Sequence, residues 1–255
     1  MASVILLLAA YGFWDLGDRR ESRSLDNRLN RAWRHFDLYC LAESFKPSAL
    51  RGFSRDKLHC GRTTAATFPF VSCKGSDTVL LLKWLYFVAT LHLGSEPGSR
   101  SAQLTQLLQL IQLGANSGLA FSQGIYGHGL WLERSCALHL RKALREFFTA
   151  YSQLAHFSMH NGHVLFGFVP KLHALAHFKQ DFDSFLRTSR SKCLNPGIYD
   201  CSMNEDFIGA ISKQSRRVAF KRYQFERTVL TSYLVKTKMV LNKFMKERLA
   251  SRGAP

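Results

Sequence analysis

The sequence predicts a mainly α protein, built as a single large multi-helix domain with at most a few short strands. Apolar residues recur at three- and four-residue steps along most of the chain, which is the period of an amphipathic helix. With 255 residues, 46% of them hydrophobic and 21% charged, the chain can bury a sizeable core and has a globular composition. We expect four regions: N-terminal helices at 1–46, a loop-rich connection at 47–78, a central helical core at 79–187 and a basic helical region at 188–255.

Two helices are expected before the first proline. The apolar run 4–10 resembles a short signal-peptide core, but no basic residue precedes it and no clear small-residue cleavage site follows it. We therefore interpret it as a buried helix. In the segment 24–43 apolar residues recur at helical spacing, and Ser24 can cap the first turn. Pro47 ends this second helix, because the residue before a proline avoids the helical conformation.

The centre of the core is expected in "VLLLKWLYFVATLHL" at 79–93. This stretch is apolar on nearly every face, which indicates a helix surrounded by other elements. It is too short to cross a bilayer and contains Lys83 and His92, so we expect no transmembrane segment.

Further helices follow the core segment. An apolar stripe that begins at Leu104 is expected to end at "GANSG", residues 114–118. The run from about 128 to 160 is either one long helix or two stacked ones, and Asn161-Gly162 stops it.

The last part of the chain is expected to be helical after a connection. Residues 163–169 are interpreted as a short strand or an extended connector, and Pro170 suits the first turn of the next helix. A loop at 195–197 leads to a region at 203–250 that is helical with possible breaks. In that region Leu230 and Leu234 begin an apolar seam.

The six cysteines contain no C-x-x-C spacing, so they predict neither a zinc ribbon nor a dithiol redox motif. In a chain of this length, scattered cysteines are typical of reduced thiols in a reducing compartment. The sequence also contains no G-x-S-x-G, P-loop or G-x-G-x-x-G motif in a suitable context.

Charge gives the main functional indication. The chain has 35 basic and 18 acidic residues, a net charge of +17, and this favours polyanionic partners, nucleic acid first and anionic lipid second. From Lys213 to Arg252 there are twelve basic residues and only Glu226 and Glu247 as acids. The alternative is a solvated helix face, which is what most runs of charge are. The candidate nucleic-acid-binding residues are Lys213, Arg216, Arg217, Lys221, Arg222, Arg227, Lys236 and Lys238.

Glu205 has two interpretations. Ser202-Met203-Asn204-Glu205 matches a capping box, in which the serine and the glutamate each bond the other's backbone N–H. This explains Glu205 completely and is the favoured interpretation; the alternative is a catalytic acid beside a phosphate-binding surface.

The histidines form two pairs with helical spacing. His156 and His160 are one turn apart, as are His173 and His177, and two facing pairs have the ligand types of a zinc site. Neither pair encloses a glutamate as in H-E-x-x-H, and histidines bonded to backbone or water are much commoner than zinc sites. We expect His173 and His177 on one helical face and predict no metal or other cofactor.

A family resemblance follows from several segments together. They are "LHCGRTTAATFPFVSCKGSDTVLLLKWL" at 58–85, "FVPKLHALAHF" at 168–178, "NPGIYDCSMNEDFIGAISKQSRRV" at 195–218 and the helical tail. This layout resembles the later half of KDZ-like cut-and-paste transposases, which are mobile-element proteins. The resemblance implies a ribonuclease-H-like core in which three acids hold divalent metal ions, with a long helical insertion before the third acid.

Carried over to this chain, the resemblance makes Pro170, His173 and His177 the end of the insertion and Glu205 the third acid. No clear strand bearing the first or second aspartate precedes the helical region, and Asp15 is the candidate that remains. Two-metal phosphoryl transfer needs carboxylates from several elements, so a chain that kept only one would bind DNA without cutting it.

The sequence is therefore compatible with three functions. The leading hypothesis is a nuclear (otherwise cytoplasmic), transposon-derived and catalytically inactive protein. It contacts nucleic acid through its C-terminal basic helices without sequence preference; DNA is favoured over RNA, but the sequence does not distinguish the two. The alternative is a helical scaffold that binds a protein partner through exposed apolar seams. The third is a metal-dependent nuclease or transposase fragment, the only case in which a divalent metal is expected.

Overall fold

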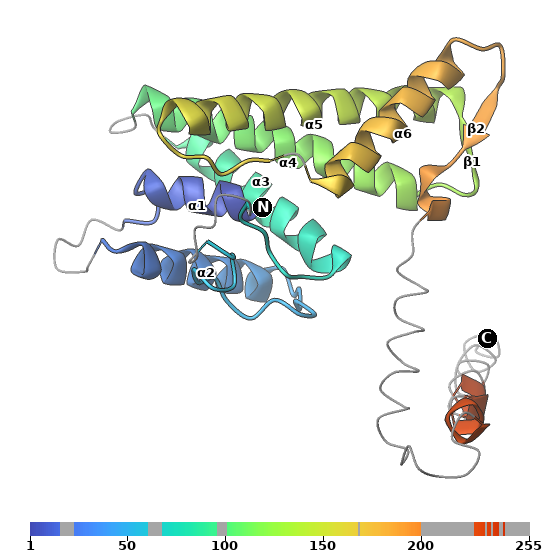
Figure 1. The fold of residues 1–255 in the computed structure, drawn as a ribbon, viewed down its shortest axis with the longest axis horizontal. Coiled ribbons are helices and arrows are strands. Elements are labelled where there is room, and N and C mark those ends of the chain that lie inside the picture. The colour runs from blue at the N-terminus through green and yellow to red at the C-terminus, as the bar shows by residue number, and fades with distance from the viewer. Residues whose placement is uncertain are drawn as a thin grey trace, which may run out of the picture. The chain divides into compact units, whose positions relative to one another are not determined.

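The computed structural model describes residues 1–15, 23–60, 68–95, 101–167 and 169–199, together with parts of 227–242. The chain divides into two compact units, Met1–Ile198 and Tyr199–Pro255. The protein is mainly α, which confirms the predicted fold class (Figure 1). The order of elements is α1 (Ala2–Ala10), α2 (Leu25–Ala42), α3 (Gly75–Gly94), α4 (Ala102–Tyr126), β1 (Trp131–Glu133), α5 (Arg134–His160), α6 (Pro170–Leu186), β2 (Lys192–Leu194) and the 3-10 turn η1 (Pro196–Tyr199).

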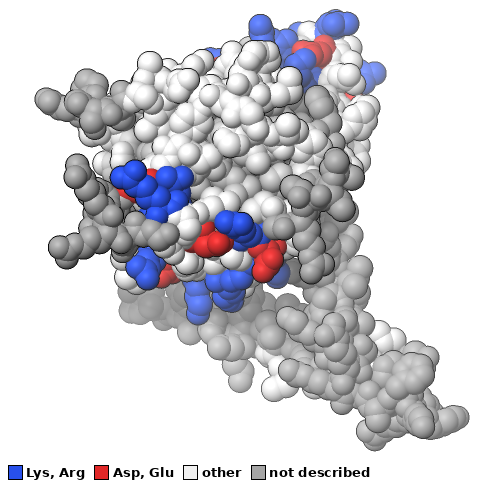
Figure 2. Space-filling model, turned by 60° about the vertical axis from the view of Figure 1, so that its left-hand side comes forward, with Lys and Arg blue, Asp and Glu red and all other residues white. Residues whose placement is uncertain are grey.

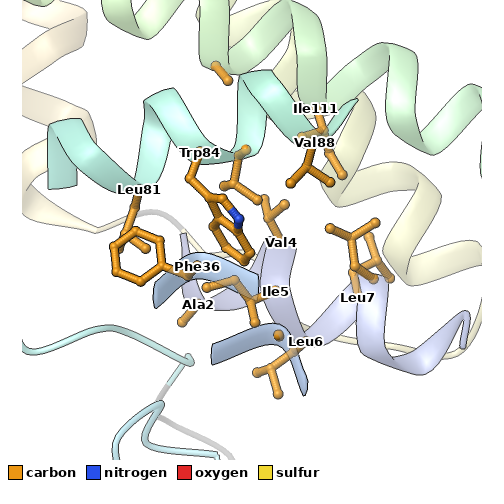
Figure 3. Packing of buried hydrophobic residues seen from close by; sticks show 14 of the residues in the cluster. Ala2, Val4, Ile5, Leu6, Leu7, Phe36, Leu81, Trp84, Val88 and Ile111 are labelled. Atoms are coloured by element: carbon orange, nitrogen blue, oxygen red, sulfur yellow. The ribbon is translucent and has the colours of Figure 1, made fainter. Parts of the chain in front are cut away.

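Helix α1 is buried along almost its whole length, as predicted for the first apolar run. Its interior residues pack against α2 and α3, and Figure 3 shows Ile5 and Leu7 in one cluster with Phe36 of α2 and Trp84 of α3. No charged side chain occurs in this helix, so it has no polar face to present to water. Burial on all sides follows from the composition of the helix.

Helix α3 covers the predicted core segment and begins four residues before it. Trp84 is completely buried, and its ring stacks on Trp14 with 5.6 Å between the ring centroids. Two apolar side chains of the same helix, Phe87 and Leu91, are 40% and 52% exposed. The helix therefore lies at the edge of the core, and it is not buried on every face.

Helix α4 does not end at residues 114–118, and that prediction is wrong. It continues to Tyr126 and runs beside α5 (Figure 1). A Cβ at Gly114 would lie 3.3 Å from the Cβ of Ala150 on α5, and one at Gly124 would lie 2.5 Å from Leu140 Cδ2. The glycines allow the two helices to approach closely, and this packing outweighs the roughly 1 kcal/mol that each glycine costs in a helix.

The structure around α5 and α6 decides between one and two helices before residue 160, and between a strand and a connector at 163–169. The run that ends at residue 160 is a single helix, preceded by the short strand β1. Asn161 follows it as the C-cap, and Gly162 has the left-handed φ of 76° that favours glycine. The described residues of 163–169 form an extended connector, and Pro170 occupies the first turn of α6 as predicted.

A two-stranded antiparallel sheet joins the start of α5 to the segment after α6. Its register pairs Trp131 with Leu194 and Glu133 with Lys192. A second apolar cluster lies at this end of the unit, where Phe182 and Phe185 of α6 pack on α5. Within the described residues, no helix is long and apolar enough to cross a membrane.

In the second unit the described residues between 227 and 242 are helical. Val229 is buried, whereas Leu230 and Leu234 of the predicted seam are 53% and 65% exposed.

Candidate functional site

Of the eight residues predicted to bind nucleic acid, Arg227 and Lys238 belong to the part of the chain that the structure describes. Both are exposed on the helical stretch of the second unit. They are eleven residues apart in the sequence. The other candidates lie outside the described residues; they are Lys213, Arg216, Arg217, Lys221, Arg222, Lys236 and the predicted cap or acid Glu205.

Asp15, the remaining candidate for a first catalytic acid, is held by two arginines. Arg28 donates to both carboxylate oxygens, with distances of 3.0 Å from Nε and 2.6 Å from Nη2, and Arg31 donates over 3.0 Å. The hydrogen bond from Arg28 holds the pKa of Asp15 below its ordinary value. Because Arg28 also donates to the carbonyl of Ala9 at the end of α1, this cluster fixes α1 against α2. Asp15 therefore has the contacts of a structural carboxylate, not those of a metal ligand.

Other basic side chains of the first unit also have partners within the fold. Arg134 at the start of α5 donates to the carbonyls of Leu186, the last residue of α6, and of Thr188 just after it. Asp183 accepts from Lys179 and Arg141. Figure 2 shows basic side chains beside acidic ones on this face, with a wide uncharged area next to them. The first unit thus uses much of its positive charge to hold its own elements together.

A buried carboxylate lies at the start of α3. Asp77 is 1% exposed and accepts hydrogen bonds from the backbone N–H groups of Ser48, Ala49 and Leu50, at 2.7, 2.8 and 3.0 Å. Burial alone would raise the pKa of Asp77, but these hydrogen bonds outweigh it and the pKa is lowered. With its oxygens occupied, Asp77 anchors the loop after α2 to α3.

The histidine pairs lie on α5 and α6, and all four side chains are exposed. His173 and His177 share one helical face, as predicted, with 2.9 Å between their Nε2 atoms and ring planes at 88°. The rings of His156 and His160 have their centroids 4.3 Å apart. Among the described residues, no three or more histidine, cysteine, aspartate or glutamate side chains come together as a metal site. The two pairs therefore do not combine into one centre.

An apolar cavity of about 100 Å³ lies among α1, α3, α4 and α5. Its walls include Leu82, Phe147 and Leu154, and Tyr151 at its edge donates its hydroxyl to the carbonyl of Gly167 over 2.6 Å. Most of the residues that line it are apolar. No sequence pattern predicts it, because its walls come from segments that are distant in the chain.

No family model, no curated protein and no solved structure matches this chain.

Proposed function

We propose that this protein binds nucleic acid, DNA rather than RNA, by contacting phosphates without sequence preference through its C-terminal basic segment. One observation carries the proposal: the twelve basic residues from Lys213 to Arg252 are accompanied by only two acids. Two acids can pair with at most two of these basic residues. At least ten positive charges therefore have no acidic partner within the segment. A high density of positive charge is what a polyphosphate binds, since it releases counterions on contact.

The described residues provide a contrast within the same chain. In the first unit, Asp15 and Asp183 each accept from two basic side chains, and Arg134 is bonded to backbone carbonyls. Those cations are already used for folding. The side chains of Arg227 and Lys238 in the second unit are exposed, so a phosphate can reach them.

We further propose that the protein is nuclear, transposon-derived and does not cleave the strand that it binds. The resemblance to KDZ-like transposases supports the ancestry. The contacts of Asp15 with Arg28 and Arg31 argue against cleavage, because both oxygens of this carboxylate already accept hydrogen bonds from arginines that neutralise its charge.

The experiment is a binding isotherm on a DNA duplex of mixed sequence, repeated over a range of salt concentrations. The wild type should show a steep fall of affinity with salt, and a second, unrelated duplex should bind equally well. Changing Arg216→Glu and Arg217→Glu together should weaken binding severely. It should also flatten the slope of log affinity against log salt by about 1.8, which is about 0.9 for each of two lost contacts.

A matched control keeps the net charge of that variant but places the change in the first unit. Arg34 on α2 and Arg145 on α5 are both exposed, so Arg34→Glu with Arg145→Glu alters the total charge identically. This control should retain most of the affinity and the slope. Equal losses in both double variants would show that only total charge matters, and would remove the C-terminal segment from the proposal.

The second candidate function is a scaffold that binds a protein partner. It is favoured by the exposed apolar side chains of the second unit, where Leu234 and Met239 are 65% and 67% exposed. Isolated apolar residues on a surface are ordinary, but several on one short helix are typical of an interaction site. A salt slope near zero for DNA, together with a partner whose binding is abolished by Leu230→Asp and Leu234→Asp, would support the scaffold instead.

A strand-nicking assay with Mg²⁺ or Mn²⁺ tests the third function. Metal-dependent nicking by the wild type that disappears in Glu205→Ala, with stability nearly intact, would establish a nuclease. We expect no nicking by either protein.

A further inference from the structure

The side chains of His173 and His177 are spaced as two neighbouring ligands of one metal ion. Their Nε2 atoms are 2.9 Å apart. With metal–nitrogen bonds of about 2.05 Å, two nitrogens at that separation subtend an angle of about 90° at the metal. A tetrahedral ion would need the same two atoms about 3.3 Å apart. The observed separation therefore matches adjacent positions of a square-planar or octahedral ion better than those of tetrahedral zinc.

We propose that the His173–His177 pair binds a late first-row divalent transition-metal ion, and that it binds Cu²⁺ most tightly. Nitrogen ligands at right angles are the preferred geometry of Cu²⁺ and Ni²⁺, and Cu²⁺ has the highest affinity for such sites among the divalent first-row ions. Both imidazoles bind in the neutral form through Nε2, with the remaining proton on Nδ1. The ion replaces the hydrogen bond that now joins the two Nε2 atoms.

The helix holds the two ligands in place before the ion arrives. Both residues lie in the first turns of α6, which Pro170 begins. Leu172, directly before His173, is 5% exposed and anchors this end of the helix to the rest of the unit. A spacing of four residues places the two side chains one above the other on the same face. Little conformational entropy is then lost on binding, since the backbone is already ordered.

The coordination sphere is open on its outer side. Both histidines are exposed, and no third histidine, cysteine or carboxylate joins them in the described part of the chain. Water or a small exogenous ligand completes the coordination. The bound ion is therefore exchangeable and accessible to a chelator, unlike an ion in a closed structural site.

The test uses the full-length chain with His156→Gln and His160→Gln, which removes the other pair from the measurement. Cu²⁺ is added and followed by calorimetry and by electron paramagnetic resonance. We expect a strong site with one Cu²⁺ per chain and hyperfine coupling to two imidazole nitrogens. In this background His177→Gln should weaken that site at least about a hundredfold, because the second bond of a chelate forms within one molecule. His173→Gln should do the same.

His128→Gln is the matched control, because His128 is an exposed histidine between α4 and β1 whose neighbours in the chain, Gly127 and Gly129, are not ligands. It should leave the affinity unchanged. Cu²⁺ should also raise the melting temperature of the parent protein and not that of the His177→Gln variant, since the ion binds only the folded helix tightly. Unchanged affinity in both single variants, or coupling to only one nitrogen, would overturn the proposal.

Discussion

Trp84 donates its indole N–H to Nδ1 of His35 over 2.9 Å, and this bond links α3 to α2 beside the stacked ring of Trp14. Trp84 is completely buried, so its N–H has no access to water. The bond requires His35 to be neutral with an unprotonated Nδ1. Burial, followed by the nearby His92, lowers the pKa of His35 below its ordinary value.

The His35–Trp84 bond predicts a loss of stability in mild acid. Because the pKa of His35 is lower in the folded state, the unfolded chain binds the proton first as pH falls. Stability from this group is constant well above about pH 6.5, the ordinary pKa of histidine, and declines below it. Urea unfolding at pH 7.5 and pH 5.5 measures the decline, and it should be smaller in His35→Gln than in the wild type or in His139→Gln. An equal decline in all three proteins would show that His35 is not the group responsible.

Removing the carboxylate of Asp77 should destabilise the protein strongly at neutral pH. Asp77→Ala leaves the backbone N–H groups of Ser48, Ala49 and Leu50 without their acceptor, and we expect a loss of about 2–4 kcal/mol in the free energy of unfolding. Since the pKa of Asp77 is lowered by folding, its contribution is present above about pH 4 and is lost as pH falls further. Asp37→Ala, at an exposed position on α2, is the control and should change little. Similar losses for both substitutions would argue against the anchoring role.

Enlarging the apolar cavity should lower the stability of the protein, and a small apolar molecule that fills the cavity should restore part of it. Leu154→Ala removes a wall of a cavity that already measures about 100 Å³, so we expect a loss toward the upper end of about 3–5 kcal/mol. Leu38→Ala, at a side chain that is 66% exposed, should cost less than about 0.5 kcal/mol. Benzene should raise the melting temperature of Leu154→Ala more than that of the wild type, because the larger cavity accommodates it. No difference between the two proteins in benzene would count against a cavity at this place.

Alanine substitutions at two glycines should change the stability of the protein differently. A Cβ at Gly124 would meet Leu140 Cδ2 at 2.5 Å, whereas one at Gly94 would have nothing within 4 Å. Gly124→Ala should therefore cost about 1–3 kcal/mol despite the better helix propensity of alanine, as overpacking does. Gly94→Ala should be neutral or stabilising by up to about 1 kcal/mol. Thermal or urea unfolding of the two variants decides, and stabilisation by Gly124→Ala would mean that α4 and α5 are not in close contact there.

Glu205 is expected to act as a helix cap. Glu205→Ala should cost about 0.5–2 kcal/mol of stability, the range for a lost capping interaction. Its effect on DNA affinity should be small, because removing one acid from a basic segment does not weaken phosphate contacts. Unfolding and DNA-binding measurements on the same variant separate this role from that of a metal ligand. A large loss of DNA affinity at unchanged stability would contradict the cap.

The sequence by itself determined the features that depend on a few neighbouring residues. Ser24 caps α2 by accepting from the backbone N–H of Asn27, and Pro170 begins α6. The burial of α1 was also predictable, because its apolar composition excludes a solvated face. The concentration of basic residues after Lys213 is likewise a property of the sequence. These are local signals, and periodicity and capping patterns express them directly.

Only the tertiary structure decided what depends on segments that are distant in the chain. The glycines of "GANSG" indicate a helix end when they are considered alone, but the approach of α5 makes the same residues a contact surface. Asp15 is a candidate metal ligand by sequence, until Arg28 and Arg31 of the next helix occupy its oxygens. The 2.9 Å between the Nε2 atoms of His173 and His177 depends on rotamers that no spacing rule fixes. Each of these outcomes is set by the positions of neighbouring groups in space, and a one-dimensional pattern does not contain them.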